Sequence, residues 1–125
     1  MAQEIIIVRG NATLNGEVRV SGAKNSALKL MAASILAQGE CVIRNVPHIS
    51  DIEVMAEVLE ELGARVERDN HEGRDEHTLT IDTESINSFE TPYELVSKMR
   101  ASISVLGPLI GRFGQASVAM PGGCQ

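Results

Sequence analysis

Aromatic side chains are the scarcest class in this chain: they make up 2% of its 125 residues, and Trp is absent. Proteins that bind single-stranded nucleic acid use aromatic rings as platforms for the bases, so this shortage argues against such a surface. The net charge of −6 likewise disfavours a general binder of nucleic-acid phosphates. We therefore expect no nucleic-acid partner, although a small anionic ligand would need only one or two well-placed cations.

Cysteines and long apolar runs are also few. Cys41 and Cys124 cannot form a disulfide framework. The segment 1–10 has neither the basic stretch nor the long apolar run of a secretory leader, and no apolar run approaches the ~20 residues that span a bilayer. These absences predict a cytoplasmic protein without a membrane partner. The 43% of hydrophobic and 22% of charged residues predict one folded domain.

The hydrophobic pattern predicts an α/β protein. Strands are expected at 5–8, 17–20, 40–44, 65–68, 78–82 and 117–120, and helices at 25–38, 51–62, 92–99 and 100–113. The helices at 25–38 and 100–113 are apolar almost all round, which is typical of helices buried on every side. Most strands instead alternate polar and apolar residues, which is typical of a sheet with one face in water. Buried helices under outer sheets invert the usual open α/β arrangement.

Two predicted helix starts carry capping signatures. Asn25 or Ser26 is expected to cap the first helix, and Ser50 with Glu53 matches a capping box. The other glutamates of the helix at 51–62 are most simply a solvated face.

The segment 21–25, Ser-Gly-Ala-Lys-Asn, lies between a predicted strand and a predicted helix. Free N–H groups and the helix dipole favour an anion at such a corner, and Lys24 would add a full positive charge. The functional interpretation is a phosphate or carboxylate site; the alternative is an ordinary exposed lysine. The glycine spacing excludes a Walker A loop.

Two later residues could contribute to an anion site. Arg100 precedes an apolar stretch, and its guanidinium could bind phosphate or carboxylate oxygens in a fork, or pair with a nearby glutamate. Cys124 follows Pro-Gly-Gly, which would expose its sulfur on a loop, where nearby cations would favour the thiolate. Its alternative is a cysteine without a role. Cys41, in a predicted strand, is more simply a small core residue.

The three histidines, His48, His71 and His77, do not form a metal-ligand pattern. The last two flank a glycine in a polar stretch that is most simply a solvated turn. We therefore expect no metal site.

Several short segments, in their order along the chain, together point to one family. They are Gly16-Glu17-Val18, Ser21-Gly22-Ala23-Lys24-Asn25, Asn45-Val46-Pro47, Pro92-Tyr93-Glu94-Leu95-Val96, Met99-Arg100-Ala101-Ser102, Arg112-Phe113-Gly114-Gln115 and Pro121-Gly122-Gly123-Cys124. This set resembles the amino-terminal part of the UDP-N-acetylglucosamine enolpyruvyl transferases.

The resemblance implies a fold, a reaction and a compartment. Its fold is a lobe of an inside-out α/β barrel, built of βαβαββ units with buried helices. Its reaction transfers the enolpyruvyl group of phosphoenolpyruvate to UDP-N-acetylglucosamine and releases phosphate, without a cofactor or metal. This is the first committed step of peptidoglycan precursor synthesis in the bacterial cytoplasm, and so concerns cell-wall biogenesis, cell shape and cell division.

The resemblance also implies residue roles. Lys24 and Asn25 would bind substrate, Arg100 would lie at the substrate site, and Cys124 would be the general acid and the target of fosfomycin-type inhibitors. Residues 1–21 would supply strands that pack with the other lobe of the enzyme. Residues 22–125 would be the first part of the amino-terminal lobe.

Some positions depart from the family pattern. Ser104 stands where a bulky aromatic residue is common, and Lys29 where many members have proline. The Arg-Pro segment that follows the cysteine in the family, and the second lobe, are not among these 125 residues. We therefore expect this chain alone to be an incomplete enzyme. The alternatives are the sister enzyme that acts on shikimate 3-phosphate and a non-catalytic fragment or module.

Overall fold

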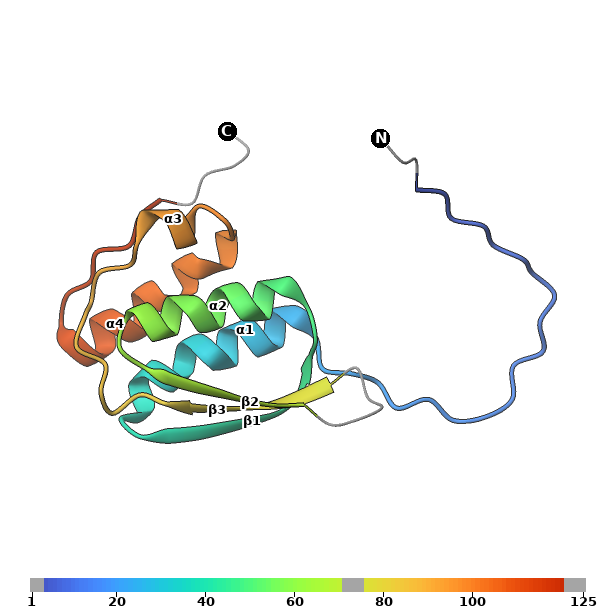
Figure 1. Ribbon diagram of the computed structural model, residues 1–125, viewed down its shortest axis with the longest axis horizontal. Helices are drawn as coiled ribbons and strands as arrows, with labels where there is room; N and C mark the ends of the chain where they lie inside the picture. The colour runs from blue at the N-terminus through green and yellow to red at the C-terminus, as the bar shows by residue number, and fades with distance from the viewer. Residues whose placement is uncertain (1–3, 71–75, 121–125) are drawn as a thin grey trace.

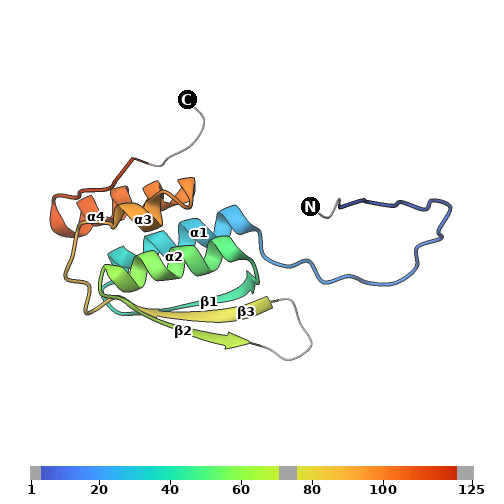
Figure 2. The ribbon, with the colours of Figure 1, turned by 45° about the horizontal axis from the view of Figure 1, so that its top comes forward.

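The computed structural model describes residues 4–70 and 76–120. In chain order, the elements are α1 (Lys24–Ala33), the 3₁₀ helix η1 (Ser34–Ala37), β1 (Glu40–Pro47), α2 (Ser50–Glu61), β2 (Arg65–Asn70), β3 (Glu76–Asp82), α3 (Tyr93–Val96), the 3₁₀ helix η2 (Arg100–Val105) and α4 (Leu106–Phe113). Helices α1 and α2 cover one face of a small sheet, and α3 and α4 lie beyond them (Figures 1 and 2). The predicted α/β class is confirmed.

The sheet has the strand order β1-β3-β2, and both pairs are antiparallel. Asp82 at one end of β3 lies opposite Glu40 and Arg65. The predicted hairpin of β2 and β3 is confirmed. The β1–β3 register shifts between Ile43 and Val46, so β1 is irregular near its end.

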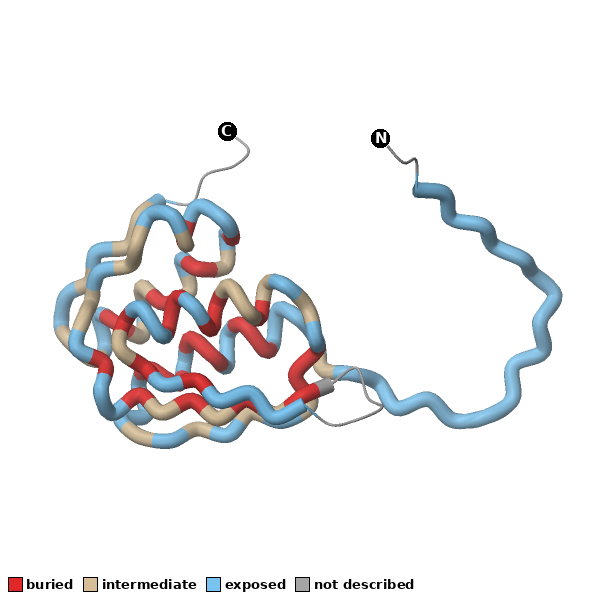
Figure 3. The backbone as a smooth tube through the Cα atoms, viewed as in Figure 1, coloured by how far each residue is buried: buried red, intermediate tan, exposed pale blue. Residues whose placement is uncertain are grey.

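The hydrophobic core lies between the sheet and the helices. Leu79 and Ile81 of β3 are fully buried because their side chains point toward the helices, as alternation along a strand requires. Met55 and Leu59 of α2 pack on them within the same core cluster. Each such side chain contributes about 1.5–3 kcal/mol when it leaves water. The other face of the sheet is largely exposed or half-buried, as the alternating strands predicted (Figure 3).

The predicted complete burial of the first apolar helix is wrong for this structure. Leu30 of α1 is 53% exposed and Leu36 of η1 is 54% exposed. Helix α1 packs on α2, β1 and η2, but these contacts leave the side of α1 that carries Leu30 uncovered by the described residues. Ile110 of α4 is also largely exposed. The sequence pattern predicted how apolar these helices are, but not how much of their surface this chain covers.

The predicted strands at 5–8 and 17–20 are also wrong for this structure. Residues 4–23, here called the arm, form neither helix nor strand and extend away from the body (Figure 1). Ile6 is 91% exposed. A strand needs a hydrogen-bonded neighbour, and no described strand pairs with the arm. The predicted strand at 117–120 is likewise replaced by a single bridge between Glu90 and Ser117.

Helix ends differ from the predicted caps. The N-cap of α1 is Ala23 and that of α2 is Ile49, and neither makes a side-chain cap. The capping box at Ser50 is wrong because Glu53 accepts a hydrogen bond from Arg68 at 2.7 Å instead. Gly107 and Pro108 lie in the first turn of α4, where proline is tolerated.

Candidate anion-binding site

The beginnings of α1 and α2 lie together at one end of the body (Figure 1). Lys24, which opens α1, forms an ion pair with Asp51 in the first turn of α2, with Nζ and Oδ2 3.0 Å apart. At the opposite end, Arg112 of α4 donates from Nη1 to the carbonyl oxygen of Ile35 at 3.0 Å. The segment η2 packs on α1, and the α4 that follows it packs on η1, which follows α1. The unit η2–α4 therefore runs parallel to α1. Arg100 is the first residue of η2 and lies at the same end as Lys24.

This parallel arrangement brings groups that can bind an anion to one side of the molecule. Each helix beginning presents unpaired backbone N–H groups and the positive end of a dipole, which together favour an anion. Lys24 and Arg100 add two full charges at this end, and both are exposed. Asn25, in the first turn of α1, is exposed beside Lys24. Three of the predicted site residues therefore lie at the same end of the molecule.

The corner before α1 depends on a glycine. A Cβ on Gly22 would collide with the carbonyl oxygen of Asn45, so only glycine permits this approach. Asn45 has φ 57°, and its Nδ2 donates to the carbonyl oxygen of Val20 at 3.4 Å. The segments 21–25 and 45–47, far apart in sequence, are thus joined by backbone contact.

The acidic partner of Lys24 was not predicted from the sequence. The Lys24 side chain is 52% exposed, and an exposed ion pair of this kind is worth only about 0–1 kcal/mol. A bound anion can therefore replace Asp51 at little cost. The signal in the sequence was Asp51 at the start of the second helix, but no spacing rule linked it to Lys24.

Arg100 has no carboxylate partner in the described part of the chain. The alternative expectation, that Arg100 pairs with a nearby glutamate, is therefore not met there. Its neighbour Ser102 is fully buried, and the hydroxyl finds no hydrogen-bond partner among the described residues.

Cys124 lies outside the described residues, so its convergence with Lys24 stays a prediction. Cys41 was expected to be a small core residue, but it is a free cysteine that is only half-buried.

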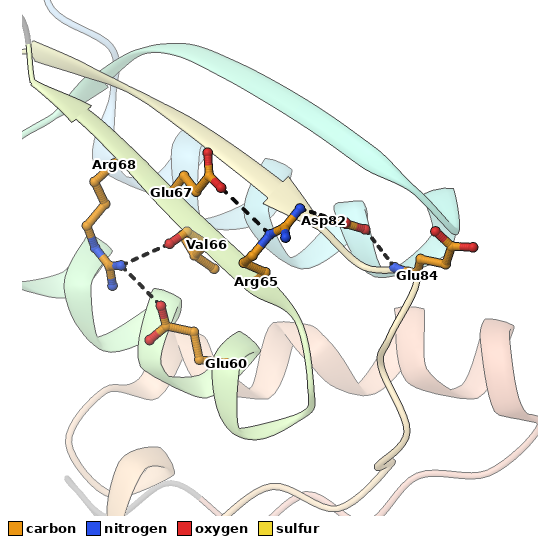
Figure 4. A network of polar contacts seen from close by, with 7 residues as sticks. All are labelled: Glu60, Arg65, Val66, Glu67, Arg68, Asp82 and Glu84. Carbon is orange, nitrogen blue, oxygen red and sulfur yellow. Dashed lines mark hydrogen bonds and ion pairs between the residues drawn. The ribbon is translucent and has the colours of Figure 1, made fainter.

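The glutamates of α2 are more than a solvated face. Arg68 of β2 donates from Nε to Glu53 at 2.7 Å and from Nη1 to Glu60 at 3.1 Å. Burial would lower the pKa of Arg68, but its hydrogen bonds to Glu60 and Glu53 outweigh that effect and raise it. Figure 4 shows Arg68 reaching Glu60. It also shows Arg65 between Glu67, on the same strand β2, and Asp82, on the neighbouring strand β3. These contacts fasten β2 to α2 and β3.

His77 corrects another expectation. It is 2% exposed and lies in β3, not in a solvated turn. Within residues 4–70 and 76–120, no group of three or more His, Cys, Asp or Glu side chains is placed to hold a metal ion. No helix in the described part of the chain has the length and apolar character needed to cross a membrane.

Comparison with known proteins identifies the family. Residues 8–125 match the family EPSP synthase (3-phosphoshikimate 1-carboxyvinyltransferase). The enolpyruvyl transferase NikO from Streptomyces tendae has a similar structure, with a TM-score of 0.67 and 34% identity over 82% of this chain and 23% of NikO. The chain therefore belongs to the EPSP synthase family, a family of enolpyruvyl transferases.

Curated relatives carry a more particular name. The UDP-N-acetylglucosamine 1-carboxyvinyltransferase of Halorhodospira halophila is 50% identical over 97% of this chain. The protein of the same name from Cellvibrio japonicus is 48% identical over 94% of this chain. These proteins confirm the resemblance drawn from the short segments. The chain spans 28% of the length of the first relative and 27% of the second.

Proposed function

We propose that this chain is the amino-terminal part of an enzyme that transfers the enolpyruvyl group of phosphoenolpyruvate to UDP-N-acetylglucosamine and releases phosphate. The observation that carries the proposal is the 50% identity, over 97% of the chain, to a protein named for that reaction. The enzyme would act in the cytoplasm, in peptidoglycan precursor synthesis, and so support cell shape and division.

The body of the chain would be the first part of an inside-out barrel lobe. The uncovered sides of α1 and α4, where Leu30 and Ile110 are exposed, support this because a complete lobe would cover them. Residues 1–21 would form strands that pack with the second lobe. The exposed, alternating apolar residues of the arm support that assignment.

The site residues would act on the two ends of phosphoenolpyruvate. Lys24, Asn25 and the N–H groups at the start of α1 would bind its phosphate, and Arg100 would bind a second anionic group of the substrates. Cys124 would give a proton to the methylene carbon of the enol. The adjacent carbon would then accept the sugar hydroxyl, and loss of phosphate with return of a proton would leave the enolpyruvyl ether.

The first test uses the 125-residue chain and both substrates. We expect no release of phosphate, because the second lobe is needed for turnover. We expect fosfomycin to alkylate Cys124, and UDP-N-acetylglucosamine to increase the yield of the adduct in intact-mass measurements. Turnover by the chain alone would contradict its incompleteness. No labelling with or without the nucleotide sugar would contradict a surviving site and favour a non-catalytic fragment.

A second candidate is the shikimate enzyme, because the matching family is described as 3-phosphoshikimate 1-carboxyvinyltransferase. Shikimate 3-phosphate and UDP-N-acetylglucosamine can be compared in the same labelling experiment. Protection or enhancement by the nucleotide sugar alone supports the first candidate. An effect of shikimate 3-phosphate alone would replace it with the second.

A further inference from the structure

His77 places an imidazole in the core beneath α2. Its neighbours on the inner face of β3, Leu79 and Ile81, are apolar and fully buried. Both ring nitrogens of His77 are buried and have no hydrogen-bond partner among the described residues. A neutral imidazole has one donor and one acceptor, and neither is satisfied by a residue in 4–70 or 76–120 for which the structure gives contacts. This position contributes nothing to the anion site and is not explained by it.

Three groups face the ring from the elements packed against β3. His48, which follows β1, lies edge-on to it, with ring centroids 5.5 Å apart and an interplanar angle of 80°. Glu53 approaches from α2 and Arg68 from β2, and these two bind each other at 2.7 Å. The Glu53 carboxylate is thus already engaged by a cation. Among the described residues, a proton on the ring would therefore be a buried charge without a free partner.

The pKa of His77 follows from these surroundings. Burial lowers it most, charge on His48 lowers it further, Glu53 opposes the change, and Arg68 again lowers it. Since the pKa is lower in the folded chain, the unfolded chain binds the proton first. The stabilising contribution of the neutral ring is therefore complete above about pH 6.5 and is lost as the pH falls below that value.

The ring also lies at a weak place in the sheet. His77 is opposite Val46 in β1 and Asn70 in β2, close to the end of each ladder. The register of β1 breaks between Ile43 and Val46, so few regular pairs hold this end. Beyond it, His48 leads directly into α2.

We propose that His77 is a proton-operated latch: its neutral ring closes this end of the sheet against α2, and protonation expels the ring and opens the pairs at Val46 and Asn70. The opposite end of the sheet, where Asp82 lies between Glu40 and Arg65, has no such group and stays closed. The latch does not depend on catalysis by the chain.

Hydrogen exchange on the full chain tests the latch. Between pH 7.5 and 5.5, after correction for intrinsic exchange rates, protection of the amides near His77 should fall several-fold, up to about the tenfold that uptake of one proton allows. Protection near Asp82 should change much less. The His77 ring should titrate together with this loss of protection, as seen by NMR. Equal protection at both ends at both pH values would overturn the proposal, as would a ring that titrates while the nearby amides stay protected.

Two variants separate His77 from the other histidines. In the unmodified chain, the unfolding equilibrium constant should rise by up to about tenfold per pH unit just below pH 6.5, as uptake of one proton requires. His77→Leu should remove most of that rise, whereas the matched control His48→Gln should keep it. An unchanged pH response in His77→Leu would overturn the proposal. If His77→Leu does not fold, hydrogen exchange and the NMR titration of the His77 ring in the unmodified chain decide whether the proposal holds.

Discussion

The arm at residues 4–23 and the body at residues 24–120 are built from similar apolar side chains but differ in how these are covered. Leu14 of the arm is 92% exposed, whereas Leu59 of the body is fully buried. Alternation of apolar residues occurs in both regions, at 17–20 and in β3. The body has a helix layer over its sheet, and the arm has no partner among the described residues. An amphipathic strand thus becomes part of a sheet only where another element covers its apolar face.

The largest effect should separate two identical substitutions. Leu59→Ala removes a fully buried side chain, and we expect it to lower the free energy of unfolding by about 2–5 kcal/mol. Leu14→Ala, in the arm, should change it by less than about 0.5 kcal/mol. Urea unfolding followed by circular dichroism measures both. Comparable losses would mean that the arm packs on something in solution, and the contrast between the regions would fail.

The junction between the regions should be nearly as sensitive. Gly22→Ala forces a Cβ against the backbone of Asn45, so the corner must shift, at a cost of about 1–3 kcal/mol. Gly10→Ala, inside the arm, meets no atom within 4 Å and should have little effect. Thermal unfolding of the two variants compares them. A neutral Gly22→Ala would show that the corner is not fixed by this contact.

A smaller effect is expected within the body, at its charged contacts. Arg68→Ala removes hydrogen bonds to Glu53 and Glu60 and should cost about 1 kcal/mol. Arg65→Ala should cost less, because the Arg65 side chain is 68% exposed, against 29% for Arg68, so water screens its charge more. Unfolding in low and in 1 M salt checks this, since salt should reduce the difference. Equal costs would show that burial does not distinguish these arginines.

The smallest effect on stability should accompany a large effect on binding. Lys24→Met removes one exposed ion pair and should change the free energy of unfolding by less than about 0.5 kcal/mol. It should nevertheless weaken phosphate binding on the order of tenfold. The matched variant Asp51→Asn keeps Lys24 and removes its competing carboxylate, so phosphate should bind more tightly. Calorimetric titration with inorganic phosphate measures both, and equal affinities in the two variants would contradict the site.

Much of the fold could be predicted from local patterns. The hairpin of β2 and β3 and the helix α2 follow from alternation and helical spacing, and both are present. The strand at 17–20 has the same local pattern but lacks a neighbour, which only long-range structure supplies. The capping box at Ser50 failed for a related reason, because Arg68 on another element competes for Glu53.

The candidate site was predictable to the same degree. Lys24 and Arg100 could be proposed because each cation precedes an apolar helix, and the parallel helices place both at one end. Asp51 and the close approach of Gly22 to Asn45 are tertiary contacts without a sequence rule. The polar neighbours of His77 in the sequence predict a turn, but the residue continues the alternation of β3.

In the proposed function, Lys24 and the start of α1 bind the phosphate of phosphoenolpyruvate, and Arg100 binds a second anionic group of the substrates. Its most direct test is titration of the ¹⁵N-labelled chain with phosphoenolpyruvate, followed by NMR. We expect saturable shifts of the amides at residues 22–26 and 99–103, which disappear in Lys24→Met. Shifts confined to the outer face of the sheet, or shifts that survive Lys24→Met unchanged, would contradict it.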